Sequence, residues 1–199
     1  MDERIEEIKR ELKESLSEYR YNHSISVMNK CIELANIHGV NVENAAIAGL
    51  LHDNSKEMSF ADNINYAKDN DIVFDEIELK VPGLMHGKVG ADIAKKKYGV
   101  SEEIAHAIRI HTTTDINMND LDKIVYIADK IEESRDEGIE NINLEREIAL
   151  VDLDKTMLII IEGTIKKLIE NKRLIHPNAI LTRNALLEKM NQQNEQKKD

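Results

Sequence analysis

The chain has 199 residues and a formal net charge of −11, and 41% of its residues are hydrophobic, 33% charged and 4% aromatic. With 8 glycines and 2 prolines, it has too few turn-forming and aromatic residues for a β-sandwich or barrel, which favours one compact helical domain. The negative charge argues against binding to nucleic acids or to anionic membranes, because both favour a basic surface.

The predicted elements are all helices, because apolar residues recur at helical spacing along nearly the whole chain. In chain order, they are expected at residues 5–16, 22–38, 45–51, from 59, 85–98, 102–111, 121–135, 144–170 and 179–190. Asn41, Ser59 and Ser101 are suited to cap the start of a helix, and Gly39 and Gly99 to end one. We therefore expect an all-α fold with a single domain over residues 1–190. The polar residues 191–199 are expected to be a disordered tail.

The compartment can also be predicted from the sequence. Cys31 is the only cysteine, which rules out an internal disulfide and suits a reducing compartment. The charged N-terminus has no signal-peptide hydrophobic region. The longest apolar run, Met157 to Ile161, is far shorter than a membrane span. These features predict a soluble cytoplasmic protein.

The third predicted helix ends in an adjacent histidine and aspartate, His52 and Asp53. At a frayed helix terminus both side chains can turn toward one ion, and imidazole and carboxylate are common metal ligands. The dipeptide alone is weak evidence, because a histidine bonded to a backbone carbonyl beside an acidic residue gives the same pattern.

Further histidine and aspartate residues lie on the apolar faces of other predicted helices. His23, His111 and Asp129 each continue an apolar stripe at spacings of three or four residues. A buried unpaired carboxylate is costly, and a metal ion is one of the few partners that offset the cost. One inward histidine is usually a core residue with a hydrogen bond. Inward histidine or aspartate residues from several separate helices instead predict a metal site between the helices.

The mixture of imidazole and carboxylate favours Fe, Mn, Ni, Co or Zn over Mg or Ca, which prefer oxygen ligands. One ion would be held by His23, His52, Asp53 and Asp129. If His86 and His111 also bind, with Asp53 as a bridge, a second ion would lie about 3.5–4 Å away. Spacing alone leaves open whether these two histidines are ligands or acid–base groups that face a phosphate.

The ordered set of these residues resembles the HD superfamily of metal-dependent phosphohydrolases. More closely, it resembles the YqeK family, bacterial symmetrical diadenosine tetraphosphate hydrolases. The matching stretches are HSISVMN at His23, AGLLHDNSKE at His52, LMHGKVGADIAKKKYG at His86, IRIHTTT at His111, YIADKIEESR at Asp129 and KRLIHPNAILTRNALL near the end. The resemblance extends from about Glu18 to Leu187. Thr114 stands where the family usually has glycine, and Asn54 where a small or aliphatic residue is common.

The resemblance implies a helical HD fold, an iron or similar ion, and cleavage of diadenosine tetraphosphate into two ADP. It implies that His23, His52, Asp53 and Asp129 hold the metal. It implies catalytic roles for Asp53, Lys56, His86 and His111. The implied substrate-binding residues are Arg20, Asp53, Asn54, Ser55, Lys56, His86, His111, Thr112, Asp129, Arg135, Lys172, Arg173, Leu174, Ile175, His176 and Pro177.

The residue types fit a nucleotide substrate independently of the resemblance. Lys56 follows Asp53 by three residues and Arg135 follows Asp129 by six, so both can bring a cation to an anionic polyphosphate. For Arg20 and Lys172, an ordinary solvated surface charge explains the residue equally well. The expected mechanism is metal-assisted attack of water, with His86 or His111 protonating the leaving phosphate.

Two alternatives remain at this level. One is a different HD phosphohydrolase activity, such as a nucleotidase or phosphodiesterase, which would use the same metal ligands. The other is a degenerate HD module that binds nucleotides without catalysis, which predicts the loss of ligands that are all present here. The apolar faces of the two long C-terminal helices suit either the core or the contact of a homodimer.

Overall fold

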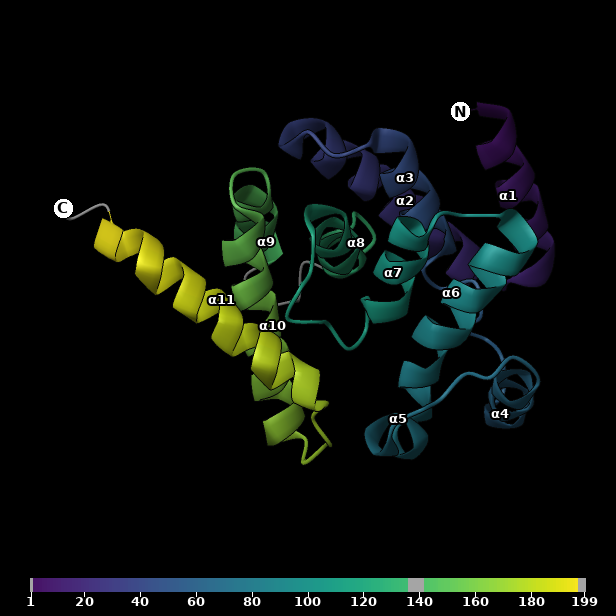
Figure 1. Cartoon of the computed structure of the whole chain (residues 1–199). Helices are drawn as coiled ribbons and strands as arrows, with labels where there is room; N and C mark the ends of the chain where they lie inside the picture. The colour runs from purple at the N-terminus through teal and green to yellow at the C-terminus, as the bar shows by residue number, and fades with distance from the viewer. Residues whose placement is uncertain (1, 136–141, 197–199) are drawn as a thin grey trace.

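The computed structural model describes residues 2–135 and 142–196, and within these ranges it contains helices and no strand (Figure 1). The α-helices are α1 Asp2–Ser15, α2 Glu18–His38, α3 Val42–Leu51, α4 Phe60–Asp69, α5 Glu76–Lys80, α6 Met85–Tyr98, α7 Glu102–Ile110, α8 Asp120–Ile131, α9 Ile142–Ala149, α10 Leu153–Glu170 and α11 Pro177–Gln196. A short 3₁₀ helix, η1 Pro82–Leu84, precedes α6. The prediction of an all-α fold is confirmed.

Helix α8 lies at the centre of the molecule. It packs against α2, α3 and α7 on one side and against α9 and α10 on the other (Figure 1). Its side chains are buried around nearly the whole helix, and Ile124, Val125 and Ile127 are fully buried. Each such side chain contributes about 1.5–3 kcal/mol of burial free energy. Polar residues on α8 therefore face packed neighbours, which is what brings Asp129 to the interior.

Two glycines allow close helix contacts that position histidines. A Cβ atom at Gly49 in α3 would lie 2.7 Å from Cys31 Sγ in α2. A Cβ atom at Gly87 in α6 would lie 2.5 Å from the carbonyl oxygen of Arg109 in α7. Real Cβ atoms do not approach other atoms this closely, so both helix pairs depend on glycine. The α2–α3 contact fixes the end of α3 that carries His52, and the α6–α7 contact holds His86 near His111.

Several predicted boundaries were wrong. Helix α2 begins at Glu18 rather than near residue 22, because the Ser17 side chain caps it and accepts a hydrogen bond from the Arg20 amide at 3.3 Å. Helix α8 ends at Ile131 rather than Arg135. The helix predicted over 144–170 is two helices, α9 and α10, and Asp152 caps the second by accepting from the Lys155 amide at 2.9 Å. Helix α5 and η1 were not predicted.

The predicted tail is helical over most of its length. Helix α11 continues six residues beyond the expected end at Met190, to Gln196, and the disorder expected for the tail stays a prediction. Glutamine and glutamate have good helix propensity, and a helix already formed extends at little cost even where it packs against nothing. Residues 197–199 lie outside the described residues.

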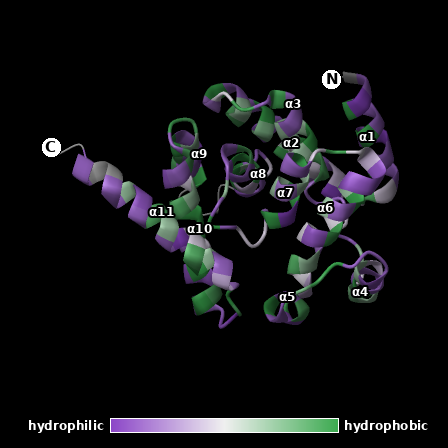
Figure 2. Ribbon diagram, viewed as in Figure 1, coloured by the Kyte–Doolittle hydropathy of each residue, from purple (hydrophilic) through white to green (hydrophobic). Residues whose placement is uncertain are grey.

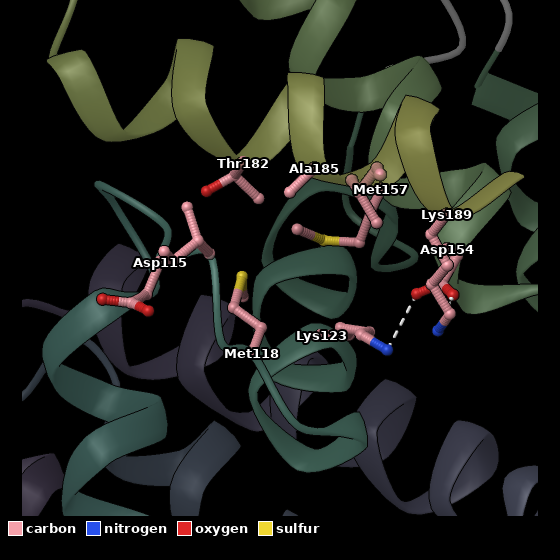
Figure 3. A pocket seen from close by; sticks show the side chains of 10 residues that line it. Asp115, Met118, Lys123, Asp154, Met157, Thr182, Ala185 and Lys189 are labelled. Atoms are coloured by element: carbon pink, nitrogen blue, oxygen red, sulfur yellow. Dashed lines mark hydrogen bonds and ion pairs between the residues drawn. The ribbon is translucent and has the colours of Figure 1, made fainter. Parts of the chain in front are cut away.

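The last two helices form a hairpin that packs on α8. Lys123 on α8 and Lys189 on α11 both pair with Asp154 on α10, at 2.8 and 2.5 Å. Lys123 and Asp154 line a cavity of about 100 Å³ together with Met118 and Met157, and Figure 3 shows these side chains. This cavity contains none of the predicted metal ligands.

Hydropathy separates the inner from the outer parts of this hairpin. Met157 and Ile161 of α10 are buried in the core, whereas Ile169 is 62% exposed. The C-terminal half of α11 is largely hydrophilic and extends away from the body (Figure 2). The apolar face of α10 thus serves the core in its first half, and the predicted homodimer contact stays a prediction. Among the described residues, no helix has both the length and the apolar content needed to cross a membrane.

Candidate metal centre

The six residues predicted to form the metal site meet in one buried cluster. They are His23 from α2, His52 and Asp53 directly after α3, His86 from α6, His111 directly after α7, and Asp129 from α8. Every one of the six is buried, with exposed fractions from 0% for His52 to 6% for Asp129. Because the elements come from separate parts of the chain, the cluster exists only in the folded protein.

All four histidines of the cluster turn the same ring nitrogen inward. The Nδ1 atoms of His52, His86 and His111 lie 2.7, 2.7 and 2.6 Å from the carbonyl oxygens of Gly49, Gly83 and Ile108. The Nδ1 of His23 lies 3.1 Å from Oε1 of Glu132. A neutral histidine that donates from Nδ1 keeps a lone pair on Nε2. In the neutral form of each ring, Nε2 is therefore the atom available to a metal ion.

Asp53 lies between two groups of histidines and presents a different oxygen to each. Its Oδ2 is 3.8 Å from His23 Nε2 and 3.5 Å from His52 Nε2. Its Oδ1 is 3.0 Å from His86 Nε2 and 3.6 Å from His111 Nε2. Asp129 adds a second carboxylate to the first group, with its Oδ1 3.0 Å from His23 Nε2 and 3.7 Å from His52 Nε2. The arrangement is that of two adjacent ligand sets that share Asp53.

The donor atoms fit a divalent metal ion. In the sets His23, His52, Asp129 and His52, Asp53, His111, the ligand atoms lie within 4.8 Å of one another. The Nε2 of His52 is buried and has no hydrogen-bond partner within the described residues. An unpaired buried polar atom is costly, and an ion at this point would satisfy it.

Charges in the cluster shift the pKa values of its members. Burial alone would raise the pKa of Asp53, but His52 and the other histidines hold it far below its usual range. Burial would likewise raise the pKa of Asp129, but Lys130 and His23 lower it well below the usual range. Both carboxylates are therefore ionised at neutral pH. Burial lowers the pKa of His86 to about 4 and also lowers that of His111, so His86 is neutral at pH 7.

Four half-buried cations surround the carboxylates. Arg20 and Lys130 pair with Asp53 Oδ2 and Asp129 Oδ2 at 2.5 and 2.6 Å. Arg135 pairs with Asp129 Oδ1 at 2.9 Å. Lys56 Nζ lies 3.2 Å from His86 Nε2 and 3.9 Å from Asp53 Oδ1. The side chains of these cations are 21–35% exposed, so solvent reaches them. They form a locally positive rim on a chain of net charge −11.

The chain can also be assigned to a known protein family. A profile of the HD domain matches residues 20–134, a stretch that contains the whole cluster. The chain belongs to the HD domain family. The HD domain is associated with divalent metal ions, which agrees with the donor set found here.

Relatives of this HD domain protein match it along most of its length. Several of them are named symmetrical bis(5'-nucleosyl)-tetraphosphatase. The protein from Halalkalibacterium halodurans is 32% identical, and the match covers 88% of this chain and 93% of that protein. The protein from Bacillus subtilis is also 32% identical, with 88% and 94% covered. A crystal structure from Clostridium acetobutylicum, described as a predicted HD superfamily hydrolase involved in NAD metabolism, has a TM-score of 0.88 and 35% identity and covers 92% of this chain and 97% of that one.

Two of the predicted substrate-binding residues, Asn54 and Ser55, bond to backbone carbonyls near the cluster. Ser55 Oγ donates to the carbonyl oxygen of His86, and Asn54 Nδ2 donates to that of Gly90, each at 3.0 Å. Both bonds tie the segment after α3 to α6. The departure at Asn54 is accommodated because position 90 is glycine, where a Cβ atom would lie 2.6 Å from Asn54 Oδ1.

The departure at Thr114 falls where the backbone favours glycine. Thr114 has a φ of 63°, a left-handed conformation that costs a residue with a Cβ atom about 1–2 kcal/mol. Its buried side chain donates to Thr182 Oγ1 at 3.0 Å, which links the loop after α7 to α11. Thr112, two residues earlier, is half-buried, and its Oγ1 has no hydrogen-bond partner within the described residues.

The loop Lys172 to Pro177 lies outside the cluster. Its one ion pair within the described residues joins His176 Nε2 to Asp75 Oδ2, at 2.7 Å, at the start of α5. Asp75, Glu78 and His176 also have metal-compatible spacing. However, Asp75 Oδ1 caps α5 and Glu78 Oε2 accepts from Lys88 at 2.6 Å, so these three are a helix cap with a salt bridge. The place of the loop at a nucleotide pocket stays a prediction.

Lys130 and Glu132 were not predicted from the sequence as part of the site. Lys130 directly follows Asp129. Glu132 lies three residues after Asp129, on the same helix face. That spacing is a signal in principle. The spacing did not identify the two residues, because lysine and glutamate in a helix are most often solvated surface residues.

The neutral state of His86 predicts a pH dependence of stability in the metal-free protein. Its pKa in the folded state, about 4, lies below the ordinary value of 6.5. Between these pH values the unfolded chain binds more protons, so the free energy of unfolding falls as pH decreases from 6.5 to 4, by up to about 3 kcal/mol. Above pH 6.5 His86 is neutral in both states, so it adds no further pH dependence. Urea unfolding at pH 7 and pH 4 should show that His86→Asn loses less stability than the wild type.

His38→Asn is the matched control for this measurement. His38 is half-buried and bonds to the carbonyl oxygen of Ala149 at 2.7 Å, away from the cluster. This variant should keep the pH dependence of the wild type. If His86→Asn lost as much stability as wild type between the two pH values, His86 would not be the buried neutral group.

Proposed function

We propose that this chain hydrolyses diadenosine tetraphosphate symmetrically, to two ADP, in the cytoplasm and with iron as the preferred ion. The observation that carries the proposal is the position of Asp53 between two histidine groups, within a rim of four cations. The long matches to proteins named symmetrical tetraphosphatases support the substrate.

The cations of the rim would bind the polyphosphate. Arg20, Lys130 and Arg135 pair with Asp53 and Asp129. When the two carboxylates serve as metal ligands, part of their attraction for these cations is lost. The guanidinium and ammonium groups can then bind phosphate oxygens, and arginine does so with two parallel hydrogen bonds. A divalent ion at the cluster would supply Lewis acidity, which lowers the pKa of water and polarises a phosphoryl oxygen.

The geometry favours ligand roles for His86 and His111. Their Nε2 atoms are 3.0 Å apart, and each Nδ1 is occupied by a backbone carbonyl. Two neutral rings in this arrangement would point lone pairs at each other, which is unfavourable unless a cation lies between them and Asp53 Oδ1. His86 is also neutral at pH 7, since burial lowers its pKa to about 4. We therefore assign both histidines to a second ion.

Lys56 is then the group placed to protonate the leaving phosphate. Burial lowers its pKa, which makes the ammonium a better acid than an exposed lysine. Its Nζ lies 3.2 Å from His86 Nε2, next to the proposed second ion. Symmetrical cleavage requires water to attack at the central phosphate bridge, so this proton would go to the departing ADP.

Chromatography of the products tests the proposal. Incubation of the protein with diadenosine tetraphosphate in H₂¹⁸O, with Fe²⁺, Mn²⁺, Ni²⁺, Co²⁺, Zn²⁺ or Mg²⁺ in turn, should yield ADP alone. One of each two ADP molecules should carry one ¹⁸O atom, and Fe²⁺ should give the highest rate. Formation of ATP with AMP, or release of inorganic phosphate, would instead indicate another HD phosphohydrolase activity. No turnover with any ion would support a non-catalytic module.

A further inference from the structure

His23 is oriented differently from the other three histidines of the cluster. His52 and His111 bond through Nδ1 to the carbonyl three residues earlier, at the C-terminal ends of α3 and α7 where such carbonyls are free. His86 bonds in the same way to the carbonyl of Gly83 in η1. His23 lies inside α2, where the backbone carbonyls accept helical hydrogen bonds. Its Nδ1 instead lies 3.1 Å from Oε1 of Glu132, 109 residues away in the sequence. Glu132 thus does for His23 what the backbone does for the other three.

Glu132 is itself held firmly at the end of α8. It is 0% exposed, and a buried carboxylate is stable only when its oxygens are well paired. Ser134 donates to it twice, from its amide to Oε2 at 2.5 Å and from its Oγ to Oε1 at 2.6 Å. Arg135 Nε lies 3.6 Å from Oε1. These partners leave Oε1 aimed at His23.

Asp129 and Glu132 enclose the imidazole of His23 from both sides. They lie three residues apart, so they share one face of the last turn of α8. His23 Nε2 is 3.0 Å from Asp129 Oδ1, and Nδ1 is 3.1 Å from Glu132 Oε1. One helix turn therefore supplies a metal ligand and the group that orients the neighbouring ligand. A carboxylate behind a ligating histidine fixes its tautomer and makes it a more basic ligand.

We infer that Glu132 is the positioning residue of this centre: it holds the Nδ1–H of His23, so that Nε2 faces the ion shared with His52 and Asp129. The inference deepens the metal site of the proposed function and rests on it only through that ion. It does not depend on the identity of the substrate.

Zinc affinity without nucleotide tests the inference. We expect Glu132→Ala to raise the Zn²⁺ dissociation constant about 10- to 100-fold, measured by competition with a chromogenic chelator. Glu132→Gln should lose less, because the amide oxygen still accepts from Nδ1–H but carries no charge. Glu133→Gln is the matched control. Its side chain is 72% exposed and pairs with Lys30 at 2.7 Å, and the variant should keep wild-type affinity.

A nuclear magnetic resonance signal separates positioning from mere stability. In the Zn²⁺-loaded wild type, the Nδ1–H proton of His23 should exchange slowly with solvent and resonate far downfield. Glu132→Ala should lose this signal, while Glu132→Gln should retain it with a smaller shift. A purely structural role would lower the melting temperature of the metal-free protein without changing the signal or the zinc affinity of the folded fraction.

Ser134→Ala is the variant to use if Glu132→Ala does not fold. It removes the hydroxyl that donates to Oε1 and should weaken zinc binding by a few-fold, with faster exchange of the His23 proton. Wild-type affinity in folded Glu132 variants, or in Ser134→Ala where these do not fold, would overturn the inference. So would an unchanged His23 signal. If the wild type did not cleave diadenosine tetraphosphate but the Glu132 variants bound zinc more weakly as expected, the proposed substrate would be wrong. The role of Glu132 would still hold.

Discussion

Asp53→Asn is expected to remove bound metal and turnover together. Among the described residues, Asp53 is the carboxylate whose two oxygens face both histidine groups, so its loss weakens both proposed ion sites. Asparagine keeps the shape but offers one neutral oxygen in place of two charged ones. Loss of several kcal/mol of metal-assisted stabilisation corresponds to a fall in kcat of at least about 10³-fold. Elemental analysis and a steady-state assay on the same preparation measure both quantities.

Asp122→Asn is the matched control for this substitution. Asp122 is also a buried aspartate that pairs with a histidine, with its Oδ1 3.0 Å from His106 Nδ1, but it lies outside the cluster. Its variant should keep metal and activity, even if it is less stable. Full metal content and a wild-type rate in Asp53→Asn would rule out the bridging role of Asp53.

The double substitution His86→Ala with His111→Ala is expected to lower the ion stoichiometry from two per chain to one. His23, His52 and Asp129 form the other ligand set and are left unchanged, so the first ion should remain. The second ion and its stabilisation of phosphate charge are lost, which should lower kcat about 10²- to 10³-fold. Elemental analysis of metal-saturated protein reports the stoichiometry.

His106→Gln serves as the control for the double variant, because His106 is half-buried but pairs with Asp122, away from the cluster. It should retain two ions and wild-type turnover. A wild type that saturates at one ion, with turnover still lost in the double variant, would instead assign His86 and His111 to contacts with the substrate phosphates.

The cations around the cluster show how much of the site could be predicted from the sequence. Lys56 and Arg135 were predicted from their spacing to Asp53 and Asp129, and the structure places both beside the cluster. Arg20 had an equally good explanation as a surface charge, but it pairs with Asp53 at 2.5 Å. Its position depends on the Ser17 cap, which starts α2 earlier than the apolar pattern predicts. Lys130 was missed because a lysine beside a buried aspartate has no periodicity of its own.

The sequence by itself determined the helical class and the inward positions of His23, His111 and Asp129. Helical periodicity specifies which face of each helix is buried, and a polar residue on that face is visible without a structure. It also placed His52 and Asp53 at the end of a buried helix, which α3 confirms.

Only the tertiary structure decided how these residues meet. Periodicity fixes a face but not how one helix is rotated or shifted against another, because that depends on packing between distant segments. The contact of Gly49 with Cys31 sets α3 against α2, and the burial of α8 brings Asp129 and Glu132 to the two sides of His23. The contacts of the two Asp53 oxygens with separate histidine groups therefore depend on the fold. The same holds for the contact of Glu132 with His23, and no motif in the sequence predicts either one.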